Sequence, residues 1–78
     1  MKQYIYFSAP WCGPCRMLGP VMERVNATIP VQKVNIEEQS ALAQQYNVRS
    51  IPTVVLLENG NEIKRIVGAK SESEYLNV

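Results

Sequence analysis

The stretch Trp11-Cys12-Gly13-Pro14-Cys15 contains both cysteines of this 78-residue chain, three positions apart. It follows an apolar, aromatic segment and precedes a segment with helical periodicity, so we expect it where a strand runs into a helix. At positions i and i+3 of a helix, two side chains lie on one face, within the separation that a disulfide tolerates. A loop this short stabilises a fold by only about 2 kcal/mol in the chain-entropy estimate. The spacing therefore favours a reversible redox disulfide over a structural crosslink.

The positions of the two cysteines predict different roles. Cys12 lies at the mouth of the expected helix, where unpaired backbone N–H groups and the positive end of the dipole favour a thiolate. We therefore expect Cys12 to be exposed and to be the attacking sulfur. Cys15 lies one turn further in, turned toward the body of the protein, and is suited to resolving a mixed disulfide on Cys12. Pro14 fits the first helical turn, and Gly13 removes side-chain bulk where a partner approaches.

The rest of the pattern predicts the element order βαβαββα. Continuous apolar residues predict buried strands over 3–7 and 53–57, alternation predicts a more exposed strand over 31–36, and the Asn59-Gly60 turn leads into a strand over 62–67. Helices are expected over 12–28 and 38–46, with at best a short one over 71–76. Pro20 predicts a kink in the first helix, and two separate short helices are the alternative.

The composition fits one small domain over residues 1–78. The chain is 46% hydrophobic and 19% charged with a net charge of +1. This balance excludes a disordered chain and indicates no nucleic-acid or acidic-surface partner. The apolar run 4–7 is too short for a signal peptide or a membrane span, so we expect a cytoplasmic protein without membrane contact.

The motif around the cysteines resembles that of the thioredoxin family, whose active-site sequence it matches letter for letter. Further matches follow in the family's order over essentially the whole chain: Pro20, Lys33, Asn35, Ile51-Pro52-Thr53, Asn59-Gly60 and Gly68. The resemblance implies an α/β minimal thioredoxin fold, with a four-stranded mixed sheet flanked by helices and without the N-terminal strand and helix of full-length thioredoxin. The strand over 31–36 then becomes a sheet edge, which Gln32 and Lys33 protect against pairing.

The same resemblance implies an enzyme that reduces protein disulfides through Cys12 and Cys15. It needs no cofactor and no metal, is expected to be a monomer, and is re-reduced by a thioredoxin reductase or by glutathione. A zinc site is the alternative from another class, but two cysteines without histidine leave it incomplete unless a dimer or an external thiol contributes.

The resemblance also implies a substrate groove. Pro52 matches the family's cis-proline, which faces the disulfide, and Ile51 offers its backbone to an extended substrate segment. The groove residues by this matching are Trp11, Gly13, Pro14, Ile36, Ile51, Val67, Gly68 and Ala69. Plain core packing is the alternative for Ile36 and Val67, and also for Trp11. Gly68 is either a strand-end kink or a point of close backbone approach, and Arg16 is expected to be a solvated helix residue.

The chain departs from the family at Tyr6, which takes the place of the buried aspartate beneath the resolving cysteine. Lys33 matches the lysine that accompanies this aspartate. Without histidine, Cys15 has no obvious general base, and water or a carboxylate such as Glu37 would have to serve. We therefore expect proton removal from Cys15 to limit the resolving step. The alternative is that Tyr6 only fills space, with its hydroxyl bonded to water or backbone, while solvent takes the proton without delay.

Two other functions remain open from the sequence. Glutaredoxins share the trimmed architecture and use glutathione, although they typically carry Pro-Tyr where this chain has Gly13-Pro14. Some thioredoxins are non-redox subunits of larger enzymes, and in that case surface loops rather than the thiols would carry the function.

Overall fold

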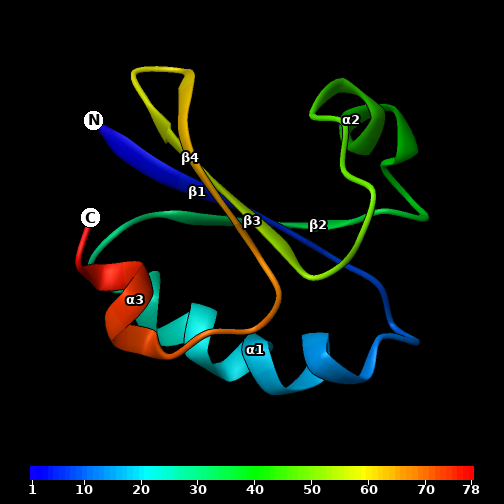
Figure 1. Cartoon of the computed structure of the whole chain (residues 1–78), viewed down its shortest axis with the longest axis horizontal. Helices are drawn as coiled ribbons and strands as arrows, with labels where there is room; N and C mark the ends of the chain where they lie inside the picture. The colour runs from blue at the N-terminus through cyan, green and yellow to red at the C-terminus, as the bar shows by residue number, and fades with distance from the viewer.

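The computed structural model describes all 78 residues as a four-stranded mixed sheet with three helices (Figure 1). The elements are β1 (Lys2–Ser8), α1 (Gly13–Val25), β2 (Val31–Asn35), α2 (Ser40–Gln45), β3 (Thr53–Glu58), β4 (Asn61–Val67) and α3 (Glu72–Leu76). The strand order is β2-β1-β3-β4; β1 is parallel to β2 and antiparallel to β3, and β4 is antiparallel to β3. The predicted fold class and element order are confirmed.

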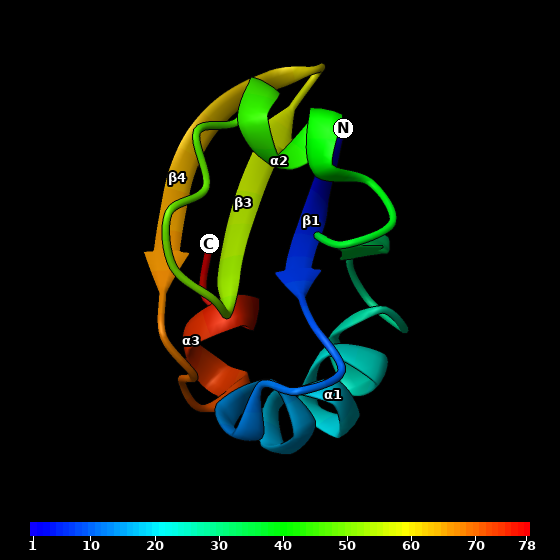
Figure 2. The ribbon, with the colours of Figure 1, turned by 90° about the vertical axis from the view of Figure 1, so that its right-hand side faces the viewer.

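Helices cover both faces of the sheet, which explains why β1 is apolar almost throughout. Tyr4 and Tyr6 of β1 pack on the face covered by α1 and α3, whereas Ile5 and Phe7 pack on the face of α2. Figures 1 and 2 show α1 and α3 together on one side of the sheet and α2 on the other. Because successive side chains of a strand point to opposite faces, a central strand in a three-layer fold must be apolar at every position.

Helix α1 runs without interruption through Pro20, so the alternative of two short helices is wrong. Its buried stripe contains Leu18, Met22 and Val25, at the spacing of one helix face. The helix ends three residues before the predicted end at 28. The Asn26 side chain accepts a 2.8 Å hydrogen bond from the backbone N–H of Val31, which closes the turn into β2.

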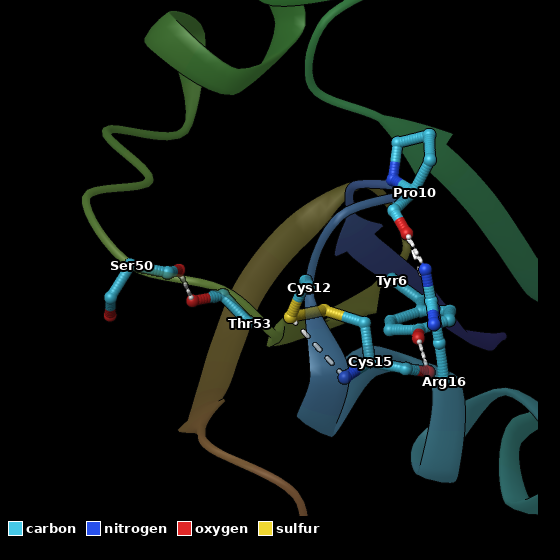
Figure 3. The surroundings of a disulfide bond; sticks show 7 residues. All are labelled: Tyr6, Pro10, Cys12, Cys15, Arg16, Ser50 and Thr53. Atoms are coloured by element: carbon cyan, nitrogen blue, oxygen red, sulfur yellow. Dashed lines mark hydrogen bonds between the residues drawn. A yellow bond between two sulfur atoms is a disulfide. The ribbon is translucent and has the colours of Figure 1, made fainter.

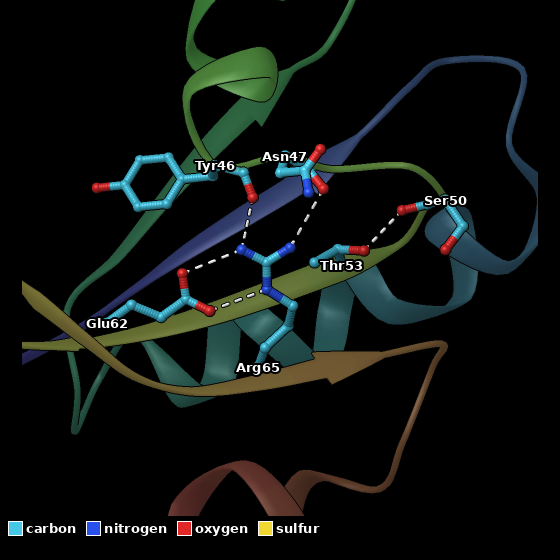
Figure 4. A network of polar contacts seen from close by, with 6 residues as sticks. All are labelled: Tyr46, Asn47, Ser50, Thr53, Glu62 and Arg65. Carbon is cyan, nitrogen blue, oxygen red and sulfur yellow. Dashed lines mark hydrogen bonds and ion pairs between the residues drawn. The ribbon is translucent and has the colours of Figure 1, made fainter.

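Helix α2 is shorter than the predicted 38–46, and a residue of β4 binds its C-terminal end. The Arg65 guanidinium donates to the carbonyl oxygens of Tyr46 at 2.5 Å and Asn47 at 3.4 Å (Figure 4). Its other partner is Glu62, whose pKa is lowered by this hydrogen bond. Arg65 thereby satisfies carbonyl groups that have no partner at a helix end.

The turn after α2 is closed at its other end by Thr53. The Thr53 hydroxyl donates a 2.6 Å hydrogen bond to the carbonyl of Ser50 (Figure 4). The segment that leads into Pro52 is therefore held at both ends. Arg65 binds its start at residues 46 and 47, and Thr53 binds it at Ser50.

Strand β2 has a neighbour on one side only, so it is the predicted sheet edge, and Gln32 and Lys33 on it are exposed. Helix α3 is attached to α1 by an ion pair between Arg24 and Glu72 at 2.5 Å. None of the three helices has the length and apolar character needed to cross a membrane.

Candidate active site

The two cysteines are joined in a disulfide at the start of α1, with their Cα atoms 5.3 Å apart. Cys12 is the N-cap residue, and its Sγ atom accepts a 3.3 Å hydrogen bond from the backbone N–H of Cys15 (Figure 3). An N-cap acceptor that carries negative charge is stabilised by the unpaired N–H groups and by the helix dipole. The helix start is therefore suited to hold the Cys12 sulfur as a thiolate once the disulfide is reduced.

The expectation that Cys12 is exposed is wrong for the disulfide form, whereas Cys15 is buried as expected. The two residues are almost equally buried, at 5% and 4% exposure. They pack with Ala9, and the half-buried side chains of Ile36 and Ile51 cover this group. Their difference lies in the backbone, because only Cys12 precedes the first helical turn.

The residues next to the disulfide are open to solvent. Trp11 is 63% exposed and Val67 is 53% exposed, so the core-packing alternatives for both are wrong. Gly13, Pro14 and Ala69 are also exposed. Ile36 is shared, since it packs against the cysteines and against the core beneath α2.

The segment before β3 meets the end of β4 through a hydrogen bond at Pro52. The Ile51–Pro52 peptide bond is cis, and the Pro52 carbonyl accepts a 2.9 Å hydrogen bond from the backbone N–H of Gly68. Gly68 has φ +91°, and a Cβ atom there would meet nothing within 4 Å. The backbone conformation, which L side chains rarely adopt, is therefore the local reason for glycine, and the space beside it is open.

Tyr6 lies beneath Cys15, on the side of the disulfide away from the turn of residues 50–53 (Figure 3). Its hydroxyl is buried and donates a 2.7 Å hydrogen bond to the Cys15 carbonyl. Burial raises the pKa of Tyr6, so the phenol stays neutral at neutral pH. Glu37 is exposed, and its side chain forms no hydrogen bond or ion pair. The Tyr6 hydroxyl therefore has the backbone partner that the space-filling alternative expects, while slow proton removal from Cys15 stays a prediction.

A pocket of about 130 Å³ opens beside Tyr6, between α1 and the free edge of β2. Its lining includes Met22, Glu23, Val31 and Lys33 but neither cysteine. Lys33 therefore lies near Tyr6, as expected, and its side chain is exposed to solvent.

Arg16 has a role that its position in the sequence does not indicate. Its side chain is exposed, as expected, yet the guanidinium donates two hydrogen bonds to the Pro10 carbonyl, at 3.1 and 3.3 Å (Figure 3). This contact joins the first turn of α1 to the loop that carries Trp11. It depends on the path of the loop, and no residue pattern signals it.

A cysteine pair that closes at a helix start, on a four-stranded mixed sheet with a cis-proline segment, defines a thiol-disulfide oxidoreductase. The family model for thioredoxin matches residues 2–78. Thioredoxin from Chlamydia pneumoniae is 49% identical over 73 residues, covering 90% of this chain and 71% of the relative. Thioredoxin 1 from Synechococcus elongatus is 40% identical over 75 residues, covering 91% and 70%.

Solved structures agree with the sequence relatives. A mutant thioredoxin from Halobacterium salinarum superposes with a TM-score of 0.91 at 37% identity, over 97% of this chain and 69% of the other. Malassezia sympodialis thioredoxin gives 0.85 at 38% identity, over 97% and 70%. This chain belongs to the thioredoxin family, and protein disulfides and a reductase are the family's partners in general.

Proposed function

We propose that this chain reduces disulfides in proteins, with Cys12 as nucleophile and Cys15 as resolving thiol. The Cys12 thiolate attacks one sulfur of the substrate disulfide, forming a mixed disulfide and releasing the other sulfur as a thiolate. The Cys15 thiolate then attacks Cys12 Sγ, which closes the Cys12–Cys15 bond and releases the second substrate sulfur. Two electrons pass to the substrate, and the chain is left oxidised. The observation that carries this assignment is the hydrogen bond from the Cys15 N–H to Cys12 Sγ at the helix start.

We propose a shallow groove beside Cys12 as the substrate site. Its members are Trp11, Gly13, Pro14, Ile36, Ile51, Val67, Gly68 and Ala69. Pro52 is fully buried and is a supporting residue rather than a contact for the substrate. The exposure of Trp11 and Val67 supports it, because large apolar side chains open to solvent beside a reactive group are typical of binding surfaces. An extended substrate segment would pair with the backbone at Ile51, as in strand addition.

We propose a thioredoxin reductase as the electron donor and the cytoplasm as the compartment. A dithiol that reduces other proteins must itself be kept reduced, which the cytosol favours. On this proposal residues 1–78 act as a single domain and as a monomer.

The electron source is tested by supplying oxidised chain with NADPH and thioredoxin reductase, or with NADPH, glutathione and glutathione reductase, and following insulin reduction. We expect turnover with the first system and little with the second. Turnover with the glutathione system and not with thioredoxin reductase would establish the glutaredoxin-like alternative. The double variant Cys12→Ser, Cys15→Ser is the control and should be inactive; a biological activity that it retains would indicate a non-redox binding subunit.

A further inference from the structure

We propose that Tyr75 on α3 is a positioning residue for protein substrates, because its hydroxyl fixes the loop that forms one side of the groove. This inference rests on the groove proposed above. Tyr75 is fully buried, and its hydroxyl bonds to the backbone on both sides of Ala69. It accepts from the N–H of Lys70 at 3.1 Å and donates to the carbonyl of Gly68 at 3.4 Å.

The loop between β4 and α3 has few other attachments. Its remaining main-chain hydrogen bonds join the Gly68 N–H to the Pro52 carbonyl and the Glu74 N–H to the Ser71 carbonyl. The main chain of Ala69 forms none. The Tyr75 hydroxyl is therefore the main restraint on the position of Ala69, and without it Ala69 and Lys70 would be held only through the bond of Gly68 to Pro52.

Gly68 connects this restraint to the cis-proline segment. Its N–H binds the Pro52 carbonyl at 2.9 Å, while its own carbonyl accepts from Tyr75. Two hydrogen bonds thus lead from Tyr75 through one glycine to Pro52, a fully buried residue that directly follows Ile51 of the groove. A shift of the loop changes the distance between the two groove segments that a protein substrate would touch together.

Tyr75 itself is held firmly, so its hydroxyl is presented in one position. Its ring packs edge-to-face on Tyr4 with the ring centroids 6.0 Å apart, and the Tyr4 hydroxyl donates a 2.7 Å hydrogen bond to the Tyr75 carbonyl. Leu18 and Met22 of α1 belong to the same core. Phenylalanine at position 75 would keep this packing and remove only the two bonds to the loop.

The test compares Tyr75→Phe with a matched control, Tyr4→Phe. The control removes the hydrogen bond to the Tyr75 carbonyl but keeps the ring packing that fixes Tyr75 and both bonds from Tyr75 to the loop. For Tyr75→Phe we expect KM for insulin to rise about threefold to tenfold, the size expected for lost neutral hydrogen bonds. Turnover of dipyridyl disulfide, too small to span the groove, should change less than about twofold. Tyr4→Phe should leave KM for insulin unchanged although both variants lose stability.

A second measurement does not depend on activity. Hydrogen exchange of the Lys70 amide should accelerate in Tyr75→Phe and stay unchanged in Tyr4→Phe, each measured in the folded, oxidised protein. An unchanged KM in Tyr75→Phe, an equal rise in Tyr4→Phe, or an unchanged Lys70 exchange rate would overturn the inference. Failure of the wild-type chain to reduce insulin would instead contradict the proposed function, and the Lys70 exchange rate would still decide whether Tyr75 restrains the loop.

Discussion

The hydroxyl of Tyr6 donates a 2.7 Å hydrogen bond to the backbone carbonyl of Cys15 in the first turn of α1. A hydroxyl committed to a carbonyl in this way is a donor, and burial raises its pKa, so it is not a base at neutral pH. The resolving cysteine therefore has no buried proton acceptor below it.

We predict that resolution of the mixed disulfide is limited by proton removal from Cys15. The rate should be low at neutral pH and rise beyond the range in which Cys12 ionises. Tyr6→Asp should accelerate resolution by at least about tenfold at neutral pH, since a positioned general base contributes about 10²–10⁴-fold. Acid-quenched single turnovers, with the mixed disulfide followed by mass spectrometry, measure this rate.

Tyr6→Asn is the matched control, because it introduces a polar side chain of the same size without a titratable group. Both variants lose stability from the polar group that they bury. If Tyr6→Asp is folded and resolves no faster than Tyr6→Asn, solvent already handles the proton and the prediction fails.

Cys12 is predicted to react before Cys15 with iodoacetamide in the reduced protein. The two are equally buried in the disulfide form, so the difference must come from the thiolate that the helix start stabilises at Cys12. Peptide mapping after brief treatment at neutral pH should find label on Cys12 in about tenfold excess. Preferential label on Cys15 would exchange the roles of the two thiols.

The variant Cys15→Ser should attack a protein disulfide and then stop. Without the second thiol the mixed disulfide on Cys12 has no internal route of release, so it accumulates. Non-reducing electrophoresis detects the covalent complex with insulin, and Cys12→Ser should form none. Wild-type turnover by Cys15→Ser would mean that external thiols resolve the intermediate.

The stability of the oxidised protein should fall above about pH 10. Burial raises the pKa values of Tyr4, Tyr6 and Tyr75. Above the unfolded value near 10, the folded state keeps protons that the unfolded chain releases, so the stabilisation is complete below this pH and is lost as pH rises. Each tyrosine contributes up to about 1.4 kcal/mol per pH unit.

Denaturant unfolding of the disulfide form between about pH 8 and pH 11 measures this slope without interference from thiol titration. Tyr4→Phe should remove about one third of it, because one of the three similar groups is lost. A free energy of unfolding that is constant over this range would contradict the assignment.

Arg65→Met should lower the free energy of unfolding by about 1–3 kcal/mol, since it leaves the carbonyls of Tyr46 and Asn47 without their donor. Lys64→Met is the control on the same strand, where the exposed side chain forms no ion pair. Thermal unfolding compares the two, and equal melting temperatures would show that water replaces Arg65 at no cost.

The order of elements and the reactive pair could be read from local pattern alone. Alternation, helical periodicity and the Asn59-Gly60 turn act over a few residues, and the structure places the strands and helices close to the predicted ranges. The i, i+3 spacing likewise brings Cys12 and Cys15 into bonding distance without any distant contact. These features follow from the local geometry of helices, strands and turns, which does not depend on the fold around them.

Contacts between residues far apart in the chain were decided only by the tertiary structure. The equal burial of the two cysteines depends on Ile36 and Ile51 from other segments, and the bond from Tyr6 to Cys15 depends on how α1 lies on the sheet. Tyr75 reads in the sequence as one apolar position of a short helix. Its hydroxyl reaches Gly68 and Lys70 only because packing on Tyr4 fixes the ring, and side-chain directions in a core are set by all the neighbours together rather than by local sequence.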